Sequence, residues 1–110
     1  MQTRPAPVPS YIYAIVRRDI PHPHLSVQIG HALVAATNAY GNPNATHPNL
    51  VLCGVADEAE LAAVFNRLKE QGVPVVGWYE EDMEGRLTAL ATGILTGAAR
   101  KPFRKFKLLE

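Results

Sequence analysis

Short apolar segments alternate with segments of helical periodicity along this chain. Tyr11–Arg17 and Asn49–Val55 are apolar on both alternating faces, a pattern that predicts buried strands covered on both sides. Between them, from His24 to about Tyr40, apolar residues recur at three- and four-residue spacing, which predicts a helix. Its inner stripe consists of Leu25, Ile29, Ala32, Leu33 and Ala36.

A second helix is predicted over residues 58–71. Asp57 and Glu60 form an Asp-x-x-Glu signal of the capping-box type at its start, and Gly72 follows at a position typical of a C-terminal cap. The apolar stripe of this helix comprises Leu61, Val64, Phe65 and Leu68.

Two further strands complete the pattern. Val73–Tyr79 and Leu87–Gly93 predict strands, joined by the polar turn Glu80–Arg86. The predicted order is β-α-β-α-β-β. Helical crossovers make the first strands parallel, whereas the short turn makes the last two an antiparallel hairpin. We therefore expect an α/β fold with a four-stranded mixed sheet flanked by helices.

The length of 110 residues predicts one domain. Residues 1–10 form a proline-rich leader, and residues 11–110 form the α/β domain with its basic C-terminal tail. The single Cys53 lies in an apolar run, which favours an inert buried thiol and a reducing compartment. No apolar run is long enough to span a membrane, so we expect a cytoplasmic protein without a membrane partner.

The densest polar group lies where the first predicted strand ends and the first helix begins. His24, Gln28 and His31 share one face of that helix because they are four and three residues apart. Ligands of α/β proteins tend to bind at the carboxyl ends of strands, and a helix N-terminus offers free N–H groups to anions. This group predicts a site, although a core histidine satisfied by a backbone carbonyl would give the same pattern.

A metal site is a weaker interpretation of the same segment. Asp19, His22 and His24 could act as ligands, but Pro23 separates the two histidines and no fourth ligand is evident. We expect neither a metal ion nor a cofactor.

Asp82 and Thr88 are the candidate site residues in the second half. Asp82 lies in the acidic turn, which could be an ordinary solvated hairpin or could project over the same sheet end. Thr88 and Thr92 are predicted to share one face of their strand, opposite Leu87 and Ala89.

The C-terminal tail interleaves cations with Phe103 and Phe106. Cations of this kind bind phosphates, and the phenylalanines would anchor the tail to the core. A solvated terminal segment is the alternative. The candidate RNA-binding residues are Arg17, Arg18, Arg100, Lys101, Arg104 and Lys105.

Several motifs together resemble those of type-2 peptidyl-tRNA hydrolases. The first is Arg18-Asp19-Ile20 followed by Val27-Gln28-x-x-His31-Ala32, similar to the family's Arg-Asp-Leu and Ala-Gln-x-x-His-Ala. The resemblance extends from Tyr11 to Leu109. It includes the Asp57–Leu61 helix start, Gly72-Val73-Pro74, Asp82, the Thr88–Ala91 strand and the Lys107–Leu109 end.

This resemblance implies hydrolysis of the ester that joins a peptide to the terminal ribose of tRNA, without a cofactor. The family's functional residues match Gln28, His31, Asp82 and Thr88. Water activation would fall to His24 or Asp82, and oxyanion donation or positioning to Thr88 and Gln28.

The chain departs from the family pattern in two places. Pro23-His24 stands where the family has Gly-Lys, and the loop Asp82–Arg86 is shortened. Near pH 7 a lysine carries a permanent charge, whereas an imidazole is mostly neutral. The alternatives are a catalytically inactive RNA- or nucleotide-binding module and a small-molecule or protein-interaction domain. A homodimer is left open.

Overall fold

The computed structural model describes residues 8–42 and 47–109. Residues 1–7 of the predicted leader and residue 110 lie outside this range. The element order predicted from the sequence is confirmed. The elements are β1 (Tyr11–Arg17), α1 (His24–Tyr40), β2 (Asn49–Val55), α2 (Glu58–Glu70), β3 (Val75–Glu80), the 3-10 helix η1 (Glu81–Met83), β4 (Arg86–Thr92) and the 3-10 helix η2 (Gly97–Phe103).

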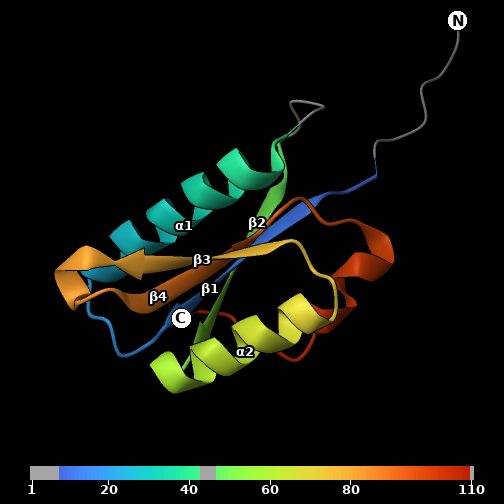
Figure 1. The fold of residues 1–110 in the computed structure, drawn as a ribbon. Coiled ribbons are helices and arrows are strands. Elements are labelled where there is room, and N and C mark those ends of the chain that lie inside the picture. Colours follow the sequence, from blue (N-terminus) through green and yellow to red (C-terminus); the bar gives the residue numbers. More distant parts are fainter. Residues whose placement is uncertain (1–7, 43–46, 110) are drawn as a thin grey trace, which may run out of the picture.

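The strands form one four-stranded mixed sheet in the order β2-β1-β4-β3 (Figure 1). β1 pairs in parallel with β2, from Tyr11 opposite Asn49 to Arg17 opposite Val55. The pairs β1–β4 and β3–β4 are antiparallel. The α/β class and the mixed sheet are therefore as predicted.

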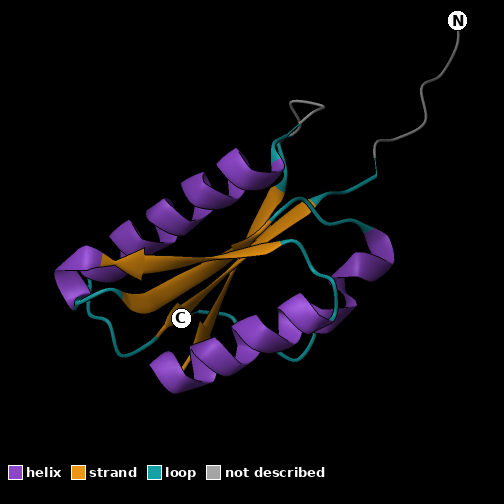
Figure 2. Ribbon diagram, in the orientation of Figure 1, coloured by secondary structure: helices purple, strands orange, loops and turns teal. Residues whose placement is uncertain are grey.

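The two α-helices cover opposite faces of the sheet, which gives three layers (Figure 2). Below α1 lies a core of small and apolar side chains, including Val16, Leu25, Ala32, Ala89 and Ala91. On the α2 side, the core has larger side chains, including Ile15, Leu61, Leu68, Leu90 and Phe103. Burial of apolar surface on both faces is what holds helices against a sheet of this kind.

The start and end of α2 follow the predicted signals. The backbone N–H of Glu60 donates to Oδ1 of Asp57 at 3.0 Å, and Oε2 of Glu60 accepts from the N–H of Ala56 at 2.9 Å. Gly72 adopts a left-handed φ of 77° after the helix. The following strand begins at Val75 rather than Val73, because the N–H of Val73 donates back to Leu68 at the helix end.

The C-terminal segment packs on the domain, as its phenylalanines predict. Phe103 is buried and stacks on Tyr13, with ring centroids 4.2 Å apart. Beyond it, the chain runs along the outer edge of β2, where Gly54 donates to Lys107 and Leu109 donates to Leu52. This pairing covers the end of one sheet edge, from Leu52 to Gly54, which would otherwise expose unpaired backbone groups.

A β-bulge in β4 changes one part of the predicted alternation. Trp78 pairs with Ala89 and Tyr79 pairs with Leu87, so Thr88 is left without a partner on β3. The extra residue turns the side chain of Thr88 toward α1. The prediction that Thr88 lies opposite Ala89 is therefore wrong, because a bulge interrupts the two-residue period.

Among the described helices, none combines the length and apolarity that crossing a membrane requires.

Candidate functional site

A cleft of about 330 Å³ opens where β1 ends and α1 begins. Three segments form its walls: the loop after β1, the first turns of α1, and the end of β3 with η1. The lining residues are Asp19, Ile20, Pro21, His24, Val27, Gln28, Glu80, Asp82 and Met83. The cleft thus brings together three of the predicted site residues, His24, Gln28 and Asp82, from distant parts of the chain.

Thr88 lies behind the cleft and holds Gln28. Its hydroxyl donates to Oε1 of Gln28 at 2.7 Å, and the carbonyl of Trp78 lies 3.3 Å from the same hydroxyl. Both side chains are buried, with exposed fractions of 0% for Thr88 and 2% for Gln28. This hydrogen bond fixes the orientation of the amide, because the fully buried hydroxyl of Thr88 has no water to bond instead.

The amide nitrogen of Gln28 faces the cleft. Among residues 8–42 and 47–109 it has no hydrogen-bond partner. Every polar side-chain atom in that range that is fully enclosed does have a partner, so this nitrogen is not fully enclosed. The nitrogen must therefore reach the open space that Gln28 lines. Its two N–H groups can donate to a bound molecule.

His31 does not line this cleft. Its imidazole stacks on Trp78, with ring centroids 4.6 Å apart and planes inclined by 15°. It borders a neighbouring groove that is lined by residues of α1, among them Val34 and Asn38, and by Trp78 of β3. The predicted face of three polar residues is therefore divided: His24 and Gln28 at the cleft, His31 beside it.

Three N–H groups in the first turn of α1 are already bonded and are not free for an anion. The N–H of Leu25 donates to the carbonyl of Pro21, and those of Ser26 and Val27 donate to Pro23. An anion at these three donors would have to displace bonds already made, so they lend no support to the expected anion site.

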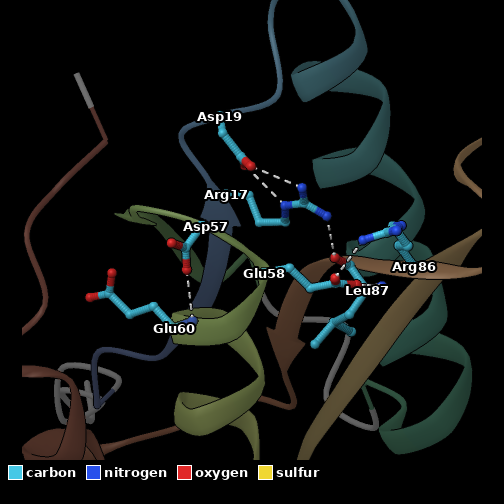
Figure 3. Close-up of polar contacts among 7 residues, drawn as sticks. All are labelled: Arg17, Asp19, Asp57, Glu58, Glu60, Arg86 and Leu87. Carbon is cyan, nitrogen blue, oxygen red and sulfur yellow. Dashed lines mark hydrogen bonds and ion pairs between the residues drawn. The ribbon is translucent and has the colours of Figure 1, made fainter.

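Arg17 is a structural residue at the end of β1 (Figure 3). Its guanidinium binds both carboxylate oxygens of Asp19 at 2.9 Å and donates to the carbonyl of Leu87 at 3.1 Å. These hydrogen bonds lower the pKa of the Asp19 carboxyl. Because Arg17 is buried and bonded on both sides, its side chain has little to offer a phosphate.

The cleft carries negative charge. Asp19 is neutralised by Arg17, whereas neither Glu80 nor Asp82 takes part in an ion pair in the described part of the chain. Glu80 accepts a hydrogen bond from the indole nitrogen of Trp78 at 2.8 Å, which holds its carboxylate at the cleft wall. Asp82 is exposed on η1.

The other predicted RNA-binding residues lie away from the cleft. Arg100 donates to the hydroxyl of Tyr13 at 2.9 Å and lies over the ring of Tyr11, at the start of β1, whereas the cleft adjoins its end. Figure 1 shows the same separation, with the red C-terminal helix far from the start of α1. Arg18 reaches over Gly54 and donates to the carbonyl of Leu108 at 3.0 Å.

Lys101 and Lys105 border a separate groove on the α2 side of the molecule. This groove, of about 580 Å³, also includes Arg67 of α2 and has Phe106 in its wall. Arg104 is exposed on the same segment. Two cations of the tail, Lys101 and Lys105, therefore lie beside α2, whereas Arg17 lies at the end of β1.

The weaker metal interpretation finds no support. Across the described ranges, no three or more His, Cys, Asp or Glu side chains gather closely enough to hold a metal ion. Cys53 is buried, and burial raises the pKa of its thiol, which favours the unreactive protonated form.

Two residues of this region were not singled out from the sequence. Glu80 was placed only within an acidic turn, although it ends β3 and lines the cleft. Trp78, the single tryptophan, contacts both His31 and Glu80. Its strand position was predictable, but its partners depend on how α1 crosses the sheet.

Comparison with known proteins shows a similar fold and no family. No protein-family model matches the sequence, and no curated protein matches it. Among solved structures, it is similar to a protein of unknown function from Agrobacterium tumefaciens strain C58, with 16% identity and a TM-score of 0.58. The match covers 92% of this chain and 98% of that chain. At this identity the likeness concerns the fold alone.

Proposed function

We propose that this protein hydrolyses the ester that joins a peptide to the terminal ribose of tRNA, at the cleft between α1 and η1. The observation that carries the proposal is the buried bond from Thr88 to Gln28, which directs an amide donor into a cleft beside His24. The resemblance of the surrounding motifs to type-2 peptidyl-tRNA hydrolases supports the same reaction.

Ester hydrolysis requires an activated water and a donor for the developing oxyanion. Imidazole is the side chain that most often transfers protons near neutral pH, so His24 is assigned the role of base. It takes a proton from water while the water oxygen bonds to the ester carbonyl carbon. Negative charge then develops on the carbonyl oxygen, to which Gln28 donates.

Collapse of this intermediate completes the reaction. The bond from carbon to the ribose oxygen breaks, and the ribose oxygen takes the proton from His24. The products are a free tRNA end and a carboxylic acid, which ionises in water. Asp82, at the same cleft, positions the water or the imidazole.

The tRNA itself would be held elsewhere. Phosphates are repelled by the carboxylates of Glu80 and Asp82, so the exposed cations of the tail are the better candidates for contact with them. Lys101, Arg104 and Lys105 are assigned this role.

A release assay with N-acetylphenylalanyl-tRNA tests the proposal. We expect release of the acylated amino acid by the purified protein, and a fall of about a hundredfold in Gln28→Met, which keeps the side-chain length but removes the donor. No release above background at high protein concentration would refute it.

The separation of the tail cations from the cleft favours a second candidate, an RNA-binding module without hydrolysis. In that case tRNA binds in a salt-dependent manner without turnover. Binding that is absent even at low salt would exclude this candidate.

A further inference from the structure

A second groove, of about 520 Å³, lies beside the cleft and is lined by residues of α1 and by Trp78 of β3. Val27 lines both the groove and the cleft, so the two adjoin each other. Among the residues whose structure is described, no Asp, Glu, Lys or Arg lines this groove, whereas the cleft has three carboxylates. The groove therefore suits an uncharged part of a ligand.

One side of the groove is an aromatic surface. The imidazole of His31 stacks on the indole of Trp78, with ring centroids 4.6 Å apart and planes inclined by 15°. His31 is exposed, and within the described ranges it makes no other ring contact and no hydrogen bond. Trp78 thus covers one face of the imidazole and leaves the opposite face for a further ring. Histidine is one of the side chains on which unpaired nucleobases stack.

Gly30 leaves part of the groove unfilled. Residues three and four positions apart are neighbours on a helix surface, so Gly30 lies between Val27 and Val34. A Cβ atom added to Gly30 would meet no atom within 4 Å outside its chain neighbours and the backbone of α1. Val27 and Val34 are 50% and 62% exposed. The groove thus combines an aromatic surface, apolar edges and open space.

Short contacts connect the aromatic surface to the donor in the cleft. The hydroxyl of Thr88 lies 3.3 Å from the carbonyl of Trp78 and donates to Gln28 at 2.7 Å. Gln28 and His31 are three residues apart on α1, a spacing that puts Cβ atoms about 5–6 Å apart. A ligand whose carbonyl oxygen is bound by Gln28 therefore has the ring of His31 within one turn of the helix.

We infer that this groove binds the terminal nucleobase of tRNA, stacked on the exposed face of His31. The inference rests on the proposed function, because it takes the carbonyl bound by Gln28 to be that of the ester. In that ester, one ribose separates the carbonyl group from the base, and tRNA ends in an adenosine. Adenine is flat and uncharged near neutral pH, as the lining of the groove requires.

Binding of adenosine tests the inference without any reaction. Adenosine carries the base and the ribose but neither a phosphate nor an ester, and ribose alone is the control ligand. Trp78 is the single tryptophan of the chain, so its indole N–H resonance is readily identified. We expect adenosine to shift this resonance in a saturable way, with a Kd in the millimolar range, and ribose to leave it unchanged. Absence of a saturable shift with adenosine would overturn the inference.

Substitutions at Gly30 assign the binding to this groove. Gly30→Leu places a side chain in the open space and is expected to weaken adenosine binding about tenfold. Gly30→Ala is the matched control, because it adds a single methyl group and gives α1 a similar gain in helix propensity. Equal affinities of the two variants would overturn the inference. His31→Phe retains a flat ring and should retain binding, whereas loss of binding in this folded variant would contradict stacking.

A second copy of the chain is the other occupant that this apolar surface fits. Sedimentation of the wild-type protein and of Gly30→Leu distinguishes the two. We expect adenosine to bind to a protein whose oligomeric state Gly30→Leu leaves unchanged. A dimer that Gly30→Leu dissociates and that does not bind adenosine would overturn the inference in favour of an interface between copies.

Hydrolysis of two esters separates this inference from the proposed reaction. N-acetylphenylalanyl-tRNA contains the terminal adenosine, and N-acetylphenylalanine ethyl ester lacks it. We expect Gly30→Leu to lower kcat/KM about tenfold for the tRNA substrate and to leave the ethyl ester unaffected. An equal effect on both esters would refute the nucleobase site and retain the hydrolase. Saturable binding of adenosine without hydrolysis of either ester would refute the hydrolase and retain the nucleobase site.

Discussion

Thr88 illustrates how one residue can organise a site that it does not itself line. As the unpaired residue of a β-bulge, its side chain turns to α1 and donates to Gln28 at 2.7 Å. Bulges often redirect side chains near functional sites. In a regular strand the hydroxyl would point to the other face, and the Gln28 amide would lose the bond that orients it.

The first prediction compares Thr88→Val with Thr92→Val. Both threonines are buried on β4, and Thr92 accepts a hydrogen bond from the backbone of Tyr13 at 3.1 Å. Each substitution leaves one buried group unpaired, so each is expected to lower the free energy of unfolding by about 1–3 kcal/mol. Only Thr88→Val should also reduce ester hydrolysis, by about tenfold, because only Thr88 orients the cleft amide.

Urea denaturation and the release assay measure the two effects separately. An equal loss of activity in the two folded variants would mean that Thr88 acts only through stability.

At the scale of elements, the start of α2 connects helix formation to the sheet. Asp57 caps the helix, and the next residue, Glu58, accepts from the backbone of Leu87 at 3.1 Å and pairs with Arg86 (Figure 3). The first turn of α2 is thereby fixed against the start of β4. The cap depends on residues that are close together in the sequence, whereas the contact of Glu58 with β4 joins residues that are distant in the sequence.

The second prediction is that Asp57→Ala lowers the free energy of unfolding by about 1 kcal/mol, because the N–H of Glu60 loses its acceptor. Urea denaturation measures the loss. Asp57→Asn is the control: it retains a capping oxygen and should lose less. Since the cap lies on the α2 side, activity of the folded variant should be unchanged.

At the scale of the whole molecule, charge is divided between two regions. The cleft beside α1 has unpaired carboxylates, whereas the groove beside α2 has three cations, Arg67, Lys101 and Lys105, and one acid, Glu60. Such a division separates the recognition of an acyl group from contact with phosphates. It also means that the two functions can be altered independently.

The third prediction follows from that separation. Replacing Lys101 and Lys105 by Gln should weaken tRNA binding and reduce its salt dependence, because phosphate contacts release counterions. Hydrolysis of a small aminoacyl ester should be unaffected. Fluorescence anisotropy across a salt series measures the first effect. An unchanged affinity and salt slope would show that the tail does not contact the nucleic acid.

Local sequence patterns determined the elements of this protein. Apolar spacing located both α-helices and the strands, the Asp57 signal located the start of α2, and the phenylalanines of the tail identified its attachment. These features depend on residues that are close in the sequence or on the apolar character of single residues, so the sequence is enough to predict them.

Tertiary structure alone decided which polar groups meet. His24, Gln28 and Asp82 meet in one cleft, whereas His31 stacks on Trp78. Arg17 is buried and paired with Asp19, and Lys101 and Lys105 of the tail lie on the α2 side. The bulge directs the hydroxyl of Thr88 to Gln28. The carbonyls of Pro21 and Pro23 accept the backbone N–H groups in the first turn of α1. Hydrogen bonds between residues distant in the chain depend on register and packing, which hydrophobic periodicity does not specify.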